Sequence, residues 1–192
     1  EDVTITNITM REIVNAPIFV RLDARMRGPA TDSVGTCQRI IISNVVAYDV
    51  DPKQGAIISG VPGHNIKDLT LSNIRIYYKG GGTAAQAKTI VPGLEKEYPE
   101  PNRFGTIPAY GFFIRNVTDL KMKDVEVNYQ QTTTRQPFML DAVNGADIEH
   151  IRAQKAKGVP NFILSNVKNF SLKDCNEIPD VKLPVVVRKE IM

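Results

Sequence analysis

One short pattern recurs along this chain of 192 residues. The stretch DVTITNITMREI at 2–13 returns as RIIISNVVAYDV at 39–50 and as DLTLSNIRIYYK at 68–79, with a weaker copy, DLKMKDVEVNYQ, at 119–130. Self-similarity at intervals of roughly 20 to 50 residues is typical of repeat architectures. Each unit of such a protein buries its apolar face only against its neighbours, so the pattern predicts a stack of similar units.

Each copy has the features of a strand followed by a corner. Apolar and polar residues alternate within it, as they do in a half-buried strand. The phase of the alternation slips at Asn7, Asn44 and Asn73, and Asp124 occupies this position in the fourth copy. Because a short amide or carboxylate side chain can hydrogen-bond a bent backbone, we expect the chain to turn at these positions.

A second strand-like segment follows each copy, and fainter first strands are present at 147–154 and 169–175. The second segments are PIFVRL 17–22, AIISGV 56–61, GFFIRN 111–116, QPFMLDAV 136–143, NFILSNV 161–167 and LPVVVRK 183–189. No amphipathic helix separates them, so we predict an all-β fold: a right-handed parallel β-helix (β-solenoid) of about six coils. An antiparallel sandwich or propeller is the alternative, but it calls for tight hairpins, and the strand after the single Asn-Gly pair, at 144–145, restarts the same register.

The sequence predicts one domain, a single β-helix segment over residues 1–192, interrupted by long loops at 23–38 and 79–108. Loops of this length in a compact fold are usually functional or disordered, and we expect these two to form opposite walls of a groove. The prolines and charges of 176–192 predict a C-terminal cap. The first pass has no such cover, so we expect an N-terminally truncated stub whose open end promotes self-association.

The composition excludes several classes of function. A net charge of +3 without dense basic runs or tryptophan argues against a nucleic-acid partner, and no apolar run is long enough for a membrane span. Cys37 and Cys175 fall on coils about 20 Å apart, too far for a disulfide. No cysteine–histidine cluster has metal-ligand spacing, so we expect no metal and no cofactor.

Alternation also sorts the second strands into two faces. It directs Ile18, Val20 and Leu22 inward and Phe19 and Arg21 outward. The expected core stripe is Phe112, Ile114, Phe138, Leu140, Phe162 and Leu164, and the expected outward column is Arg21, Gly60, Arg115, Asp141 and Ser165. Arg115 and Asp141 are then neighbours on adjacent coils, where they could pair.

Three long phrases carry a resemblance to a known family. They are EDVTITNITMREIVNAPIFVRLDARMRGP at 1–29, ISGVPGHNIKDLTLSNIRIYYKGGGT at 58–83 and EKEYPEPNRFGTIPAYGFFIRNV at 95–117. The chain up to about residue 150 resembles the C-terminal portion of bacterial glycoside hydrolase family 28, the polygalacturonase-like enzymes. The resemblance implies a right-handed parallel β-helix, a secreted or periplasmic location, and a parent protein that hydrolyses glycosidic bonds in galacturonate-containing polysaccharide such as pectin.

The catalytic motifs of that family are missing from this chain. Asn-Thr-Asp, Asp-Asp and Arg-Ile-Lys do not occur, and the nearest match to Gly-His-Gly is Gly63-His64-Asn65. Inverting hydrolysis needs a general acid and a general base about 6.5–9.5 Å apart. We therefore name no catalytic residue and expect the segment alone to be inactive.

Five residues are candidates for substrate binding. Arg21, Arg25 and Arg27 cluster where the family's groove continues, and each offers a planar fork for a sugar carboxylate. Solvated surface arginines, or pairs with Asp23 and Asp32, are the alternative. His64, in a turn, and Tyr110, which could stack on a sugar ring, complete the set; both residue types more often hold a loop in place.

Other functions remain open at this point. A non-catalytic β-helix module that binds acidic polysaccharide has the same fold and ligand as the hydrolase segment. A pectate lyase or a phage tailspike also has this fold, but a lyase calls for a calcium site of clustered carboxylates, and the outward column contains none.

Overall fold

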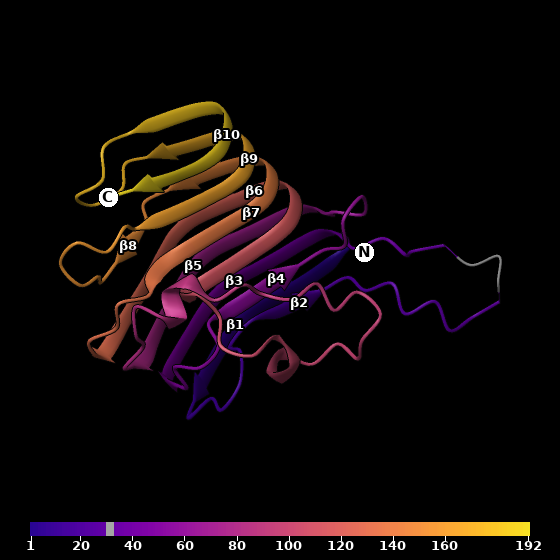
Figure 1. Cartoon of the computed structure of the whole chain (residues 1–192), viewed down its shortest axis with the longest axis horizontal. Coiled ribbons are helices and arrows are strands. Elements are labelled where there is room, and N and C mark those ends of the chain that lie inside the picture. Colours follow the sequence, from indigo (N-terminus) through magenta and orange to yellow (C-terminus); the bar gives the residue numbers. More distant parts are fainter. Residues whose placement is uncertain (30–32) are drawn as a thin grey trace.

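A computed structural model describes residues 1–29 and 33–192 of the chain, and its fold is mostly β with almost no helix (Figure 1). Two single-turn 3-10 helices, η1 (Gln86–Lys88) and η2 (Pro101–Phe104), lie in the loop between β5 and β6. The strands are β1 (Val3–Arg11), β2 (Phe19–Arg21), β3 (Gln38–Val50), β4 (Ala56–Ser59), β5 (Ile66–Gly80), β6 (Ala109–Gln131), β7 (Gln136–Glu149), β8 (Arg152–Ala153), β9 (Phe162–Lys173) and β10 (Val181–Ile191).

The sheet is mostly parallel and does not close on itself. Its main path runs β1-β3-β5-β6-β7-β9-β10, while β2 pairs with β4, and both β4 and β8 pair with β6. Every pair in it is parallel except β9 with β10. The predicted repeat register is confirmed, since Ile5 pairs with Ile42 and Ile42 with Leu71.

The predicted corners are confirmed as sharp bends within long strands. Asn7, Asn44, Asn73 and Asp124 have φ values of 60°, 54°, 49° and 54°. This left-handed region is one that Asn and Asp tolerate better than most residues. The Asn44 side-chain amide donates to Asn7 at 3.0 Å, and that of Asn73 donates to Asn44 at 2.8 Å. Because the bends preserve strand pairing, the second strand of one pass and the first strand of the next form one continuous strand. For example, β6 contains both 111–116 and 119–130.

The core lies inside the bent strands and follows the predicted alternation. The whole expected stripe is buried, and the rings of Phe112, Phe138 and Phe162 stack at centroid distances of 6.0 and 4.7 Å. Ile18 and Leu22 are buried as well, while Phe19 packs outside this core against Phe104. Aligned burial of this kind removes apolar surface from water at every step of the stack.

The two ends of the sheet differ. β10 runs antiparallel to β9, with Val186 opposite Val167, so 183–189 does not continue the parallel passes as predicted. The turn between them, where Cys175 bridges Ile178, reverses the chain and brings β10 across the end of the stack. At the other end, β1 pairs only with β3 among the described residues, and Val3 and Ile5 are 40% and 39% exposed.

The two long loops are not opposite walls of a groove, which corrects the prediction for 23–38 and 79–108. Both extend from the same side of the stacked strands (Figure 1) and contact each other. The Ala24 amide donates to the Glu95 carbonyl at 2.7 Å, and the Arg25 guanidinium lies 4.8 Å from the centre of the Tyr98 ring. This backbone hydrogen bond and this cation–π contact help to hold the loops together.

Both cysteines are free thiols, as predicted. Cys175 is buried, accepting from the Ile151 amide at 3.4 Å and donating to the Lys173 carbonyl at 3.3 Å. Burial raises the pKa of both the Cys37 and the Cys175 thiol, which favours the unreactive protonated form.

Candidate functional site: a cationic cleft between the long loop and the sheet

Polar and charged residues form one outward row across the second strands. The strand pairing places them in the order Arg21, Ser59, Arg115, Asp141, Ser165 and Arg188, a row that we call the arginine column. The predicted column differs at one position, because Ser59 rather than Gly60 is the partner of Arg115. Gly60 lies one residue further on, where a Cβ atom would come 2.3 Å from the Asn116 carbonyl oxygen.

Two arginines of the column hold the long loop 81–108 against the sheet. Arg115 donates to the carbonyls of Val91 at 3.1 Å and Pro92 at 2.9 Å, and Arg21 donates to the carbonyl of Gly93 at 3.0 Å. Both also donate to the Ser59 hydroxyl. Because these bonds occupy the guanidinium groups, Arg21 and Arg115 are loop anchors in this structure.

Burial lowers the pKa of both arginine side chains. It lowers the pKa of Arg115, while the charges of Asp141 and Glu95 act in the opposite direction. The pKa of Arg21 is lowered first by burial and then by the neighbouring charge of Arg115. Arginine starts from so high a pKa that both remain cationic, so two like charges share this face.

Apolar contacts reinforce the loop's position. Phe104 and Ile107 of the loop form a small cluster with Ile57 and Phe113, which point outward from β4 and β6. All four side chains are buried, so the loop covers an apolar part of the outer face of the sheet. This second core lies outside the strands and fixes the loop over one half of the arginine column.

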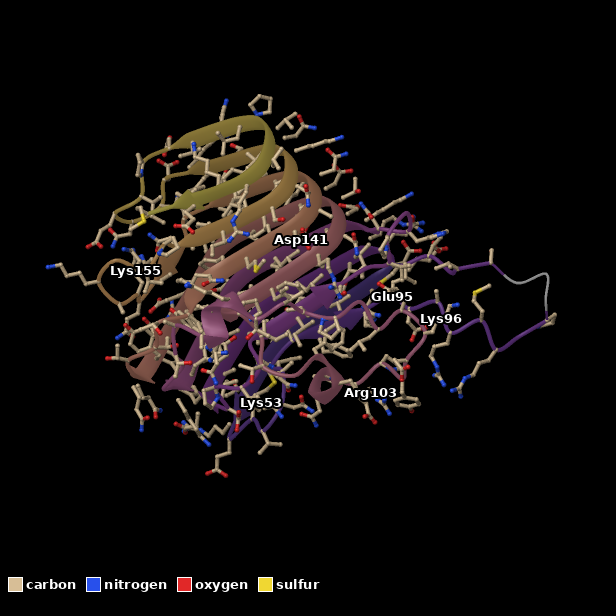
Figure 2. All side chains as sticks on the ribbon, viewed as in Figure 1. Lys53, Glu95, Lys96, Arg103, Asp141 and Lys155 are labelled. Carbon is tan, nitrogen blue, oxygen red and sulfur yellow. The ribbon has the colours of Figure 1, made fainter. Side chains whose placement is uncertain are left out.

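A cleft of about 170 Å³, which we call the loop cleft, remains between the loop and the other half of the column. Figure 2 labels Asp141 on the stacked strands and Glu95 and Lys96 on the neighbouring loop. The residues lining the cleft are Ala87, Lys88, Thr89, Ile90, Val91, Pro108, Phe113, Arg115, Gln136, Met139, Asp141, Ile163 and Arg188. Three cationic side chains and one carboxylate give this lining a net charge of +2.

One buried group in the loop cleft lacks a partner. Gln136 is only 2% exposed, and its side-chain nitrogen has no hydrogen-bond acceptor within the described residues. An unsatisfied buried donor costs about 1–3 kcal/mol, and native structures contain few of them. Nothing in the sequence marks Gln136, because the burial of its amide depends on how the loop folds back over β6 and β7.

Arg188 and Lys88 at the cleft are exposed, and neither side chain has a hydrogen bond or ion pair with any described residue. Sequence reasoning missed both. Lys88 lies within the loop insertion, while Arg188 lies in β10, whose antiparallel reversal brings it opposite Ser165. Asp141 was placed correctly as the neighbour of Arg115, but no hydrogen bond or ion pair joins the two within the described part of the chain.

The other candidate residues do not gather at the loop cleft. Arg25 is stacked on Tyr98, and Arg27 is exposed on the loop beside the undescribed residues 30–32, where Asp32, its suggested partner, also lies. His64 is exposed in a turn and lines a separate cavity of about 100 Å³. Arg21 and Arg25 therefore contact different parts of the long loop, the Gly93 carbonyl and the Tyr98 ring.

Tyr110 corrects a prediction, since it is fully buried and has no surface that could meet a sugar. Its hydroxyl donates to the Gln154 carbonyl at 2.5 Å, and its ring packs edge-on against Tyr78 and Tyr129. Burial raises the pKa of the Tyr110 hydroxyl, with Tyr78 and Tyr129 adding to the effect. The residue stabilises the core where the loop returns to β6.

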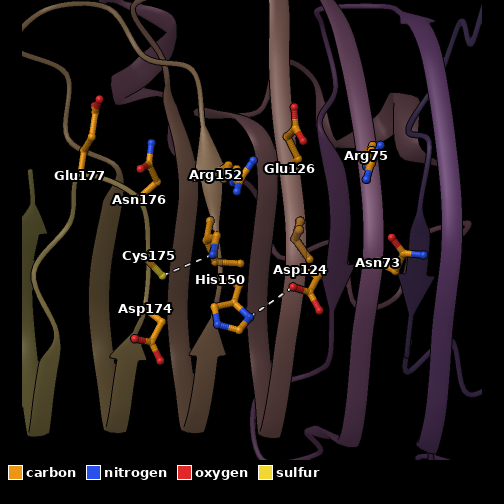
Figure 3. Close-up of a pocket in the computed structure, with 12 residues that line it drawn as sticks. Asn73, Arg75, Asp124, Glu126, His150, Arg152, Asp174, Cys175, Asn176 and Glu177 are labelled. Carbon is orange, nitrogen blue, oxygen red and sulfur yellow. Dashed lines mark hydrogen bonds and ion pairs between the residues drawn. The ribbon is translucent and has the colours of Figure 1, made fainter.

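A second cavity, larger than the loop cleft, is an open groove of about 750 Å³ on another face, the flank groove (Figure 3). His150 lies 3.3 Å from Asp124 there, and the strand pairing places Glu126 between Arg75 and Arg152. Its charged lining is Arg75, Arg152, Asp124, Glu126, Asp174 and Glu177, with His150 beside them. With His150 neutral, the net charge is −2, which disfavours an anionic ligand.

The described residues contain no group of three or more side chains of the metal-ligating types placed to hold an ion. Among residues 1–29 and 33–192 there is also no helix with the length and apolar character needed to cross a membrane. The chain matches no known protein-family profile, no curated protein and no solved structure. The resemblance to family 28 glycoside hydrolases therefore stays a prediction from the sequence.

Proposed function

We propose that the strands form a right-handed parallel β-helix closed at its C-terminal end by β10. Three features support this fold: parallel pairing between segments that recur along the chain, bends at left-handed residues in matching positions, and one apolar core running through the stack. Such a fold presents long outward ladders of side chains, and the arginine column is one of them.

On this fold we propose that the chain binds galacturonate-containing polysaccharide. It would be the C-terminal, binding part of a pectin-degrading hydrolase resembling the polygalacturonases, a secreted or periplasmic protein. The observation that carries the proposal is the loop cleft, with its net charge of +2, two unpaired cations and one unpaired amide donor. Polygalacturonate has a carboxylate on every sugar, and a positively charged cleft concentrates such a polymer.

The same cleft argues against catalysis by this segment. Its lining contains a single carboxylate, Asp141, whereas hydrolysis of a glycosidic bond needs a carboxyl acid and a second carboxylate. A catalytic site in a hydrolase of this kind would be formed by other residues of the whole protein, and the present residues would hold the chain that is being cut.

Affinity electrophoresis in gels containing polygalacturonate tests the proposal. We expect the protein to be retarded, less so at high salt, and hardly at all by fully methyl-esterified pectin, which is uncharged. Removing both free cations in Lys88→Ala/Arg188→Ala should reduce the retardation. The matched control, Arg75→Ala on the flank groove, should not. An unretarded wild-type protein would refute the proposed function.

A further inference from the structure

We propose that the loop cleft receives a single uronate residue of the polysaccharide and that the side-chain amide of Gln136 donates a hydrogen bond to it. This inference rests on the proposed function and goes beyond it, because it assigns a subsite, its size and the residue that recognises the sugar. Gln136 is the only residue of the loop cleft whose buried polar atom has no partner within the described part of the chain.

The chemistry of an unpaired buried amide points to an oxygen-rich ligand. The side-chain nitrogen of Gln136 can only donate, so the group that satisfies it must be an acceptor. Sugar hydroxyl, ring and carboxylate oxygens all accept. A ligand oxygen at this position would recover the free energy lost by leaving the donor unsatisfied.

The charges around Gln136 favour a carboxylate on that sugar. Arg188 and Lys88 reach the cleft from β10 and from the loop, and neither is neutralised by a described residue. Asp141 lies two strands from Arg188, with Ser165 between them, a separation of about 10 Å. A sugar between them would place its carboxylate toward Arg188 and a hydroxyl toward Asp141, because like charges repel.

The size of the cleft limits the ligand to one ring. Its volume of about 170 Å³ corresponds to about six water molecules at about 30 Å³ each. The half-buried Met139, with Ile163 beside it, provides an apolar surface for the C–H face of the ring, and the few polar groups fix its orientation. The rest of the polymer would extend out of the cleft into solvent.

Two variants test this assignment by calorimetric titration with galacturonate and with polygalacturonate. Gln136→Leu keeps the side-chain size and removes the donor, so we expect affinity for galacturonate to fall about tenfold. Met139→Trp fills the cleft and should abolish galacturonate binding. Gln130→Leu, an exposed glutamine of β6 that donates to Asp49, is the matched control and should bind as the wild type does.

Stability separates a binding role for Gln136 from a structural one. Removing an unsatisfied buried donor should leave the urea midpoint of Gln136→Leu unchanged or higher, so weaker binding could not be ascribed to unfolding. If Gln136→Leu and Met139→Trp bind galacturonate as the wild type does, the subsite is refuted. Binding of polygalacturonate by the same proteins would still support the proposed function. If the wild type binds neither ligand, both proposals fail.

Discussion

Arg115 holds the long loop in place, and replacing it should release the loop without unfolding the sheet. Its three hydrogen bonds to loop carbonyls, at 2.9, 3.1 and 3.3 Å, each come from a charged donor. Such bonds contribute about 1.5–3 kcal/mol when buried, but Arg115 is partly exposed, so we assign about 1 kcal/mol each. Arg115→Met keeps the packing against Phe113 and should therefore lower the free energy of loop opening by about 2–3 kcal/mol.

Hydrogen exchange measured by mass spectrometry gives a direct test. A loss of about 2–3 kcal/mol corresponds to roughly 30- to 140-fold faster exchange of protected amides, since about 1.4 kcal/mol is a factor of ten. We expect the change in peptides covering 94–105, where the Glu97 and Arg103 amides are hydrogen-bonded, and not in β6. The control is Arg75→Met, whose side chain has no hydrogen bond in the described structure. Unchanged exchange in Arg115→Met, or equal acceleration in both variants, would refute the anchoring role.

Three further predictions follow from the core, the open end and the chemistry. Burial raises the pKa of Tyr78 and Tyr110, so as the pH rises the unfolded chain loses these protons before the folded chain does. The free energy of unfolding should therefore be constant in this respect below about pH 10 and fall by about 1.4 kcal/mol per tyrosine for each pH unit above it. Equal urea midpoints at pH 9 and 11 would contradict this. The exposed edge of β1 should cause concentration-dependent association in light scattering that Ile5→Lys reduces, whereas a monomer at all concentrations would speak against it. The pure chain should release no reducing ends from polygalacturonate, and activity abolished by Asp141→Asn would overturn that expectation.

The parts of the fold that the sequence predicts are those governed by local periodicity. The Asn7, Asn44 and Asn73 column and the Phe112, Phe138 and Phe162 stripe were found because one residue type recurs at one position of the repeat. The direction of β10 was missed, since its alternating apolar residues fit either direction of pairing. A bridged turn like that of Cys175 and Ile178 also occurs at Val61 and His64, where the following strand β5 pairs in parallel, so such a turn does not by itself predict the reversal.

The candidate site was less predictable because it depends on an insertion outside the repeat. Arg21 was correctly placed on the outward face, yet its guanidinium bonds the Gly93 carbonyl, more than 70 positions away. Tyr110 is of a residue type that often stacks on sugar rings, but it is buried where the loop returns to β6. Gln136 had no signal at all, because its missing partner is a property of the folded loop and sheet together.

A crystal structure of the protein soaked with trigalacturonate would test the central claim most directly. We predict one sugar ring in the loop cleft, with an oxygen within hydrogen-bond distance of the Gln136 nitrogen and the sugar carboxylate beside Arg188. A saccharide bound instead in the flank groove between Arg75 and Arg152, or an empty loop cleft at saturating ligand, would contradict the account.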